Sequence, residues 1–302
     1  MTTFAIIGFG ELGCALAEGL GRSGDHVIRA YAPRRGGRGA EAALADRIER
    51  ARASTSESLD EAVAGAGVVL SAVPASASLE VAEEVAPRIG RDSYFVDLTS
   101  APLEEIRAAA EIIDRSGARY VDAAVLGAVA AIGADVPIAA SGAGARDWCA
   151  LARDCGLAVE FLEGPAGHAT LLKLLRSVYM KGREALIVEM MHAAWRHGLD
   201  EQVARSIAGP GEQVAFSALA DRVLCSLALH ARRRAGELLN SSEVLAEGGV
   251  DPVATRAGAE ALAGLAQLDL DEAFDHRRPV SGRDVLAKID ELSVRGSAAN
   301  GS

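Results

Sequence analysis

The feature that most constrains the fold is a glycine-rich turn at residues 8–13. A short apolar run before it has the pattern of a buried strand, and the residues after it have the pattern of a helix. The turn itself reads Gly-x-Gly-x-x-Gly. Gly8 allows a tight turn, Gly10 lets a pyrophosphate approach the backbone, and Gly13 lets the helix pack closely on the sheet. This strand–turn–helix context predicts dinucleotide binding rather than a plain tight turn.

The helix after this turn would direct its first amides at phosphate groups, with the positive end of its dipole behind them. We therefore expect the whole turn to contact the cofactor. These predicted cofactor-binding residues are Gly8, Phe9, Gly10, Glu11, Leu12 and Gly13.

The first half of the chain alternates strand-like and helix-like segments. The predicted strands after the first lie at residues 26–31, 68–73, 94–98, 119–121, 136–140 and 158–162. This alternation predicts a mostly parallel sheet covered on both faces. We therefore expect a Rossmann-type α/β domain over residues 1–162, with ligands at the carboxyl ends of its strands.

The pattern changes near Gly164, where a cluster of Gly and Pro ends the alternation. Residues 168–197 form a long helical run without Pro, with apolar residues on all sides. Nearly everything beyond also reads as helix, so we expect an all-helical domain for substrate binding and dimerisation over residues 163–292. Residues 293–302 are rich in Ser, Gly, Ala and Asn, which predicts a disordered tail.

Composition and charge exclude several classes of partner. A formal net charge of −11 argues against nucleic acid, because phosphate backbones need a basic face. The four cysteines show no metal-binding spacing, which is typical of a reduced cytosolic protein without a metal. No apolar stretch reaches membrane-spanning length, and the first strand begins too close to Met1 for a signal peptide. We expect a soluble cytoplasmic protein.

Three later segments and one lysine carry a resemblance to known proteins. The segments are Val-Leu-Ser-Ala-Val-Pro at residues 69–74, Val-Asp-Leu-Thr-Ser-Ala-Pro at residues 96–102 and Val-Asp-Ala-Ala-Val-Leu-Gly at residues 121–127. The lysine is Lys173, early in the long helical run. Together with the glycine-rich turn, they resemble the superfamily of β-hydroxyacid dehydrogenases and 6-phosphogluconate dehydrogenases. Residues 173–189 and 230–237 are similar to one branch, which has a phosphogluconate dehydrogenase-like C-terminal domain.

The resemblance implies roles for individual residues. Lys173 would be the catalytic acid/base, and Ser177, one helical turn later, could orient it or the substrate. Lys181, two turns on, could hold a substrate carboxylate or phosphate; a solvated cation is the alternative. Asp97 and Asp122 read as structural caps at strand ends. The implied cofactor contacts also include Ala72, Val73, Pro74 and Thr99. The implied substrate contacts are Ser100, Leu126, Gly127, Lys181, His230 and Arg233, the last two reaching the active site of a partner subunit in a homodimer.

The sequence departs from the family pattern at four positions. In the substrate loop, Ala124 replaces Pro and Leu126 replaces the substrate-binding Ser. On the long helix, Ser177 stands in place of the usual Asn, and Met180 in place of the Glu of true 6-phosphogluconate dehydrogenases. These changes argue against that sugar phosphate and favour a substrate with a less polar body.

The end of the second predicted strand bears on the choice of nicotinamide cofactor. Enzymes that use NAD place an Asp or Glu there to accept hydrogen bonds from ribose hydroxyls. Here Ala32 follows Tyr31, and Arg34 and Arg35 come soon after. A guanidinium can bind a 2′-phosphate through two hydrogen bonds. We therefore expect NADP(H) to be preferred over NAD(H), with Tyr31, Arg34 and Arg35 at the cofactor; a solvated basic loop is the alternative.

The chemistry of Lys173 completes the expected reaction. An ammonium can donate a proton to the oxygen that gains charge when a hydride reaches a carbonyl carbon, and lysine is charged at neutral pH. We expect hydride transfer between NADP(H) and a small, anionic carbonyl or hydroxy compound, such as an oxo acid or hydroxy acid. One alternative is an imine reductase, although those enzymes usually replace the lysine. A different class is a non-catalytic NADPH-binding sensor or scaffold.

Overall fold

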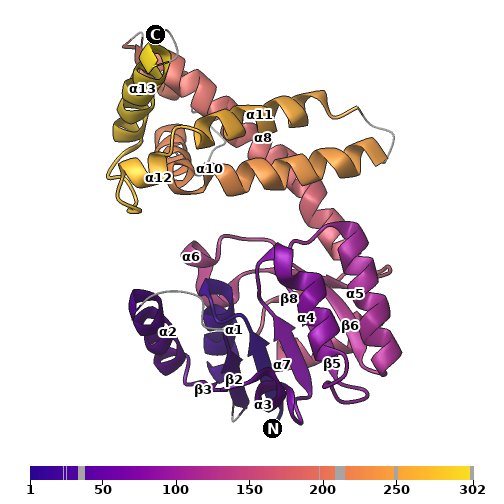
Figure 1. The fold of residues 1–302 in the computed structure, drawn as a ribbon. Helices are drawn as coiled ribbons and strands as arrows, with labels where there is room; N and C mark the ends of the chain where they lie inside the picture. Colours follow the sequence, from indigo (N-terminus) through magenta and orange to yellow (C-terminus); the bar gives the residue numbers. More distant parts are fainter. Residues whose placement is uncertain are drawn as a thin grey trace. The chain divides into compact units, whose positions relative to one another are not determined.

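The computed structural model describes residues 1–22, 24, 26–32, 38–196, 198–207, 215–247 and 251–299 of the 302. The chain divides into two compact units, Met1–Lys173 and Leu174–Ser302 (Figure 1). The division falls within one long helix, later than the boundary expected at residue 162.

The first unit is an eight-stranded sheet with helices on both faces (Figure 1). Its strands are β1 (Thr3–Ile7), β2 (Val27–Tyr31), β3 (Ser54–Thr55), β4 (Val68–Ser71), β5 (Tyr94–Asp97), β6 (Arg119–Val125), β7 (Ile138–Ser141) and β8 (Val159–Phe161). Its helices are α1 (Glu11–Arg22), α2 (Arg38–Arg50), α3 (Leu59–Val63), α4 (Ser78–Val85), α5 (Leu103–Ser116), α6 (Val129–Ile132) and α7 (Ala145–Asp154), with short turns η1 (Ala75–Ala77) and η2 (Gly133–Asp135).

The strand order is β3-β2-β1-β4-β5-β6-β7-β8. All neighbouring strands pair in parallel except β6 and β7, which are antiparallel. The two-residue strand β3 was not predicted, whereas the other strands lie where the hydrophobic runs predict them. The Rossmann-type α/β fold expected from the sequence is therefore confirmed.

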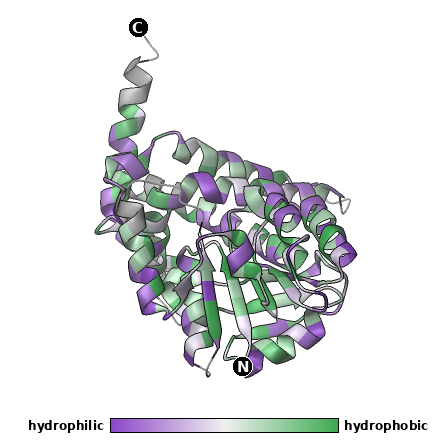
Figure 2. Cartoon of the chain, turned by 60° about the horizontal axis from the view of Figure 1, so that its bottom comes forward, coloured by the Kyte–Doolittle hydropathy of each residue, from purple (hydrophilic) through white to green (hydrophobic). Residues whose placement is uncertain are grey.

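The central strands bury both faces, which explains their nearly continuous apolar sequences. On β1, Ile6 lies in one core with Trp148 of α7, and Ile7 lies in the other with Phe95 and Ile106. Successive residues of a strand point to opposite faces, so one apolar strand supplies both cores. Most strand residues are accordingly hydrophobic, while the helices mix hydrophobic and hydrophilic residues (Figure 2).

All regular secondary structure in the described part of the second unit is helical, as expected. Its helices are α8 (His168–Arg196, which begins in the first unit), α9 (Asp200–Ile207), α10 (Phe216–Glu247), α11 (Val253–Ala266), α12 (Leu270–Ala273) and α13 (Gly282–Ala299). Helices α10 and α11 pack side by side (Figure 1). Leu227 and Leu238 of α10, Leu262 of α11 and Leu286 of α13 lie in one buried core.

Helix α13 runs to Ala299 and so overlaps residues 293–302, for which the sequence predicts a disordered tail. Val285, Leu286 and Ile289 of this helix pack their side chains into the core of the second unit. Residues 300–302 lie outside the described part of the chain. Within the described residues, no helix combines the length and apolarity needed to cross a membrane.

Candidate functional site

The glycine-rich turn forms a cradle at the carboxyl end of β1. Gly8 has φ of +88°, and a Cβ atom there would lie 2.6 Å from the carbonyl oxygen of Ala72. A Cβ on Gly13 would lie 2.4 Å from the carbonyl oxygen of Gly8, so both positions exclude a side chain. A Cβ on Gly10 would meet no atom within 4 Å. The backbone at Gly10 therefore faces open space, which fits the approach of a pyrophosphate.

The first turn of α1 presents unpaired amides at this cradle. The first hydrogen bond along α1 joins the amide of Cys14 to the carbonyl of Gly10, at 3.1 Å. The amides of residues 11–13 precede that bond, and such amides suit a phosphate group. Glu11 is exposed, whereas the Phe9 side chain is buried in the core and Leu12 packs against the same core. Phe9 could thus reach a cofactor only through its backbone.

The other predicted cofactor contacts lie along the same sheet edge. The amide of Gly8 donates to the carbonyl of Tyr31, and the amide of Ala72 donates to that of Ile7. These bonds bring the ends of β1, β2 and β4 together. Val73 and Pro74 lead from β4 into η1. Arg34 and Arg35 lie outside the described residues.

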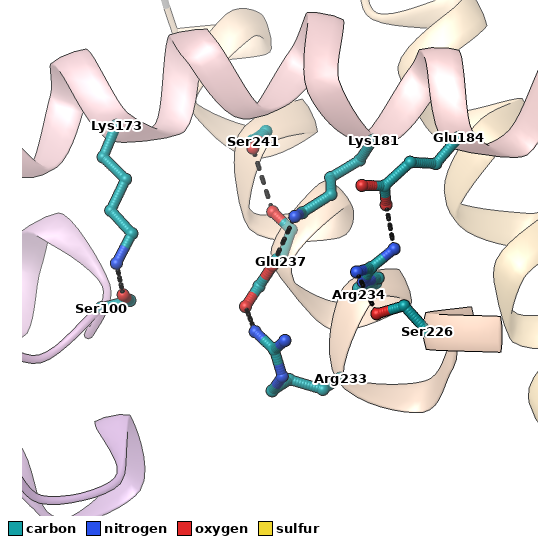
Figure 3. A network of polar contacts seen from close by, with 9 residues as sticks. All are labelled: Ser100, Lys173, Lys181, Glu184, Ser226, Arg233, Arg234, Glu237 and Ser241. Atoms are coloured by element: carbon teal, nitrogen blue, oxygen red, sulfur yellow. Dashed lines mark hydrogen bonds and ion pairs between the residues drawn. The ribbon is translucent and has the colours of Figure 1, made fainter. Parts of the chain in front are cut away.

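Lys173 and Ser100 meet within the first unit. Lys173 lies on the second turn of α8, and its Nζ atom is 2.5 Å from Ser100 Oγ (Figure 3). Ser100 lies three residues after the end of β5, the strand two places from β1, so this contact lies at the carboxyl edge of the sheet. The structure therefore brings together two predicted residues that are 73 positions apart.

A buried carboxylate fixes the loop that carries Ser100. Asp97, at the end of β5, accepts hydrogen bonds from Ser78 Oγ at 2.7 Å, Tyr120 Oη at 2.9 Å and the amide of Thr99 at 2.9 Å. Burial, together with the nearby carboxylate of Asp97, raises the pKa of Tyr120 well above its ordinary value. The phenol therefore stays a hydrogen-bond donor. Thr99 is itself buried and accepts from the amide of Ala101 at 3.4 Å.

The predicted substrate loop packs near the start of α8. The amide of Leu126 donates to the carbonyl of Pro137 at 2.8 Å, and its half-buried side chain packs against a cluster that includes Ala169 of α8. A Cβ on Gly127 would lie 2.7 Å from Cδ1 of Ile132, so a side chain there would require Ile132 to move. Leu126 thus places an apolar side chain where the family has a serine.

The predicted residues of the second unit form an ion-pair cluster. Lys181 Nζ lies 3.4 Å from Glu237 Oε2, and Arg233 pairs with the other oxygen of Glu237 (Figure 3). Beside them, Arg234 lies 2.6 Å from Glu184 Oε2 and 2.7 Å from Ser226 Oγ. The sequence did not single out Glu184 or Glu237. Only the four-residue spacing between Arg233 and Glu237 on one helix could have indicated part of this cluster.

Ser177 and His230 are the remaining predicted residues. Ser177 is half-buried on α8. His230 lines a cavity of about 500 Å³ in the second unit, with Arg233 also on its wall. Burial, helped by the guanidinium groups of Arg233 and Arg234, lowers the pKa of His230, so its imidazole is held neutral. Across the described part of the chain, no group of three or more His, Cys, Asp or Glu side chains is arranged to hold a metal ion.

Comparison with known proteins identifies the family. Residues 3–148 match the family model described as the NAD binding domain of 6-phosphogluconate dehydrogenase. Residues 194–265 match a domain of unknown function, DUF1932. No curated protein matches the sequence.

Solved structures extend the similarity to the whole chain. A conserved protein of unknown function, reported for its structural similarity with 3-hydroxyacid dehydrogenases, is 30% identical with a TM-score of 0.67, over 90% of this chain and 97% of that one. Mycobacterium tuberculosis 3-hydroxyisobutyrate dehydrogenase, solved with L-serine, is 18% identical with a TM-score of 0.73, over 97% and 99%. A reductive aminase from Aspergillus terreus, solved with NADPH and ethyl levulinate, is 20% identical with a TM-score of 0.57, over 97% and 99%.

The similarities to the 3-hydroxyisobutyrate dehydrogenase and the reductive aminase show the fold. The similarity to the conserved protein that is 30% identical shows the family. The protein is thus a hydroxyacid-dehydrogenase-like oxidoreductase with an NAD(P)-binding domain. It belongs to the superfamily of β-hydroxyacid dehydrogenases and 6-phosphogluconate dehydrogenases, in a branch that carries the DUF1932 domain.

Proposed function

We propose that the protein transfers a hydride reversibly between NADP(H) and a small carbonyl or hydroxy compound, with Lys173 as general acid/base. The observation that carries this proposal is the 2.5 Å contact between Lys173 Nζ and Ser100 Oγ at the carboxyl edge of the sheet. Parallel α/β sheets bind their ligands at that edge.

The chain's own groups account for the proton in this reaction. A bound nicotinamide would supply or accept the hydride. In reduction, the Lys173 ammonium donates a proton to the substrate oxygen as negative charge develops on it. The Ser100 hydroxyl accepts a hydrogen bond from the ammonium and can donate its own hydrogen to the substrate oxygen. In oxidation, the same two groups act in the reverse direction.

The preference for NADP(H) rests on the end of β2. Ala32 offers no carboxylate to the ribose hydroxyls, and Arg34 and Arg35 follow in the sequence. Changing both arginines to Ala should remove most of the preference for NADPH over NADH. Equal or tighter binding of NADH by the wild type would contradict this assignment.

Two features support a substrate with an anionic group and a less polar body. The Lys173 ammonium, beside Ser100, is a cation that would attract an anionic group near the reacting oxygen. Leu126 offers an apolar side chain in the loop that the family uses for substrate. We therefore favour an oxo acid or hydroxy acid with an apolar body.

We further propose that the protein forms a homodimer. On α8, Leu175 is 50% exposed and Tyr179 is 66% exposed, and their four-residue spacing places them on one helical face. Apolar side chains gathered on one face are typical of a surface that a second subunit covers. Sedimentation that shows a monomer at micromolar concentration would contradict this proposal.

A substrate panel tests the proposed reaction. The protein is mixed with NADPH or NADH and with 3-oxo acids, aldehyde acids or cyclic imines, and oxidation of the nicotinamide is followed by absorbance. We expect turnover of at least one oxo or aldehyde acid with NADPH, and its loss in Lys173→Met. Because a reductive aminase shares the fold, reduction of imines is the second candidate, and turnover of imines alone would establish it. Tight NADPH binding without turnover of any compound would instead support a sensor or scaffold.

A further inference from the structure

A row of buried polar residues crosses the sheet at its carboxyl edge. In the strand pairing, Ser71 of β4 stands opposite Asp97 of β5, Asp97 opposite Asp122 of β6, and Asp122 opposite Ser141 of β7. All four residues are fully buried or nearly so. The antiparallel register of β6 and β7 places Ser141 opposite Asp122. Ser141 Oγ donates a hydrogen bond to Asp122 Oδ2 at 3.0 Å.

Asp122 and Ser141 together cap the N-terminus of α8. The amides of Gly167 and Thr170 donate to Asp122 Oδ2 at 2.9 and 3.0 Å, and Thr170 Oγ1 donates to Oδ1 at 2.6 Å. The amide of Ala169 donates to Ser141 Oγ at 2.9 Å. These amides belong to the first turn, where a helix has no partners of its own. A carboxylate there also interacts favourably with the helix dipole.

Burying the carboxylate of this cap costs free energy, which argues that a fixed position of α8 is important for function. Burial raises the pKa of Asp122 despite the hydrogen bonds that favour its charged form. A local cap from a residue next to the helix would avoid burying a charge. Here the carboxylate comes from a strand 48 positions before Thr170 and fixes the helix directly to the sheet.

The cap lies one helical turn from Lys173. The loop that carries Ser100, the partner of Lys173, is held by Asp97, which stands next to Asp122 in the polar row. Thr170 and Lys173 are three residues apart on α8, so their side chains share a face. Asp97, opposite Asp122, holds the amide of Thr99 and thereby the loop that carries Ser100. Lys173 is thus held through Asp122 of β6, and Ser100 through Asp97 of β5. These two aspartates stand opposite each other on adjacent strands.

We infer that Asp122 and Ser141 are positioning residues, which hold the start of α8 on the sheet so that Lys173 meets Ser100 and the reacting oxygen. This inference rests on the proposed role of Lys173. When a catalytic group is positioned in this way, a displacement of the Lys173 ammonium by about 1 Å can lower the rate by about 10²-fold without changing cofactor binding.

The test reads the environment of Lys173 directly. The sequence contains three lysines, Lys173, Lys181 and Lys288. Reductive methylation with carbon-13-labelled formaldehyde therefore gives three side-chain signals in an NMR spectrum, beside that of the α-amino group, and single Lys→Arg variants assign them. The positioning variant is Ser141→Ala/Thr170→Val, which removes two hydroxyls of the cap without changing any charge. Ser93→Ala is the matched control, because it removes one hydrogen bond, to the carbonyl of Ala66, at the opposite end of the sheet.

We expect the Lys173 signal to shift and broaden in the double variant, while the Lys181 and Lys288 signals keep their wild-type positions. The single variant Thr170→Ser keeps the hydroxyl, so its Lys173 signal should stay at the wild-type position. Ser93→Ala should move none of the three lysine signals. A folded double variant with an unchanged Lys173 signal would overturn the inference. If the double variant does not fold, Thr170→Val alone carries the same comparison, because valine has the shape of threonine.

Kinetics separates this inference from the proposed function. With a panel compound that turns over, the double variant should lose about 10- to 100-fold in kcat and keep its affinity for NADPH. If Lys173→Met retains full turnover while the double variant still moves the Lys173 signal, the cap stands and the proposed role of Lys173 fails. If Lys173→Met is inactive and the double variant changes neither the signal nor kcat, the role stands and the cap inference fails.

Discussion

The two units of this protein stabilise buried or half-buried carboxylates in different ways. In the first unit, Asp97 and Asp122 accept hydrogen bonds from hydroxyl groups and backbone amides. In the second unit, Glu184 pairs with the guanidinium of Arg234, and Glu237 with Lys181 and Arg233. Neutral donors fix the direction of each contact, whereas an ion pair mainly holds two segments together.

This difference matches what each region has to do. The neutral donors of the first unit fix a loop and a helix end on either side of the Lys173–Ser100 contact. The Lys181–Glu237 and Arg234–Glu184 pairs of the second unit join α8 to α10. We therefore expect the largest change in rate from a variant at the Lys173–Ser100 contact, and the largest change in stability from a variant of the buried Arg234–Glu184 pair.

The largest effect should come from the lysine of the first unit. Lys173→Met keeps the aliphatic stem and removes the charge, so carbonyl reduction should slow by about 10² to 10⁴, as for a lost general acid. The measurement is the single-turnover rate with the best compound of the panel. NADPH affinity, measured by fluorescence titration, should stay within about twofold of wild type, because the glycine-rich cradle is intact.

Two results would break this assignment. Near-normal turnover in Lys173→Met would mean that another group supplies the proton, with His168, Ser177 and Lys181 as the next candidates. Slow turnover caused only by lost NADPH binding would mean that Lys173 acts at the cofactor and not at the substrate.

The next effect concerns the buried ion pair of the second unit. Glu184 and Arg234 are only 10% and 12% exposed, so Glu184→Gln leaves a buried guanidinium without its anion. Breaking such a pair costs about 3–5 kcal/mol. We expect a loss of this size in the free energy of unfolding, measured by denaturant titration with circular dichroism.

Glu201→Gln is the matched control, because it breaks an ion pair whose partners, Arg205 and Glu201, are 68% and 71% exposed, so water screens that pair. It should lower the free energy of unfolding by less than about 1 kcal/mol. Equal losses in the two variants would show that burial does not set the strength of these contacts.

A smaller effect should follow from removing one neutral donor to Asp97. Tyr120→Phe keeps the aromatic ring stacked on Phe95 and deletes the hydroxyl that donates to the carboxylate. A hydrogen bond to a charged group contributes about 1.5–3 kcal/mol, so the first unit should lose about that much. The fluorescence of Trp148 in a Trp195→Phe background reports on this unit alone. A loss below about 0.5 kcal/mol would mean that Ser78 and Thr99 satisfy Asp97 without Tyr120.

The smallest effect should have the opposite sign. Ser71 is buried at the next position of the polar row, and its hydroxyl finds no hydrogen-bond partner among the described residues. Ser71→Ala removes an unpaired polar group, so stability should stay the same or rise by up to about 1 kcal/mol. A loss above about 1 kcal/mol, read by the same Trp148 fluorescence, would show that this hydroxyl is satisfied in solution.

The sequence predicts the fold well because the strands carry strong local signals. The apolar runs at β1, β4 and β5 are nearly continuous and bounded by turns, and the glycine-rich turn directly follows the first of them. Composition does not predict how far α13 extends, because it does not report that Val285 and Ile289 pack into the core. Strand β3 has only two residues, too few for a pattern.

The candidate site is less accessible to sequence reasoning, because its contacts join distant positions. The family motifs mark Lys173 and Ser100 separately, but no spacing shows that they touch. Asp122 is expected to cap a strand end, but it lies within β6 and caps a helix that begins far along the chain. The antiparallel pairing of β6 with β7 brings Ser141 opposite Asp122. A run of apolar residues predicts a strand but does not predict its direction in the sheet.

Chemical rescue of Lys173→Ala tests the central claim most directly. The substitution removes the ammonium and most of its stem, so a small primary ammonium ion can occupy the space. With the best panel compound and saturating NADPH, methylammonium should raise the single-turnover rate in proportion to its concentration, because it can donate a proton to the substrate oxygen. Tetramethylammonium has the same charge but no N–H group, and it should have no effect. Equal rates with the two ions, or no response to methylammonium, would contradict the account of Lys173 as the proton donor.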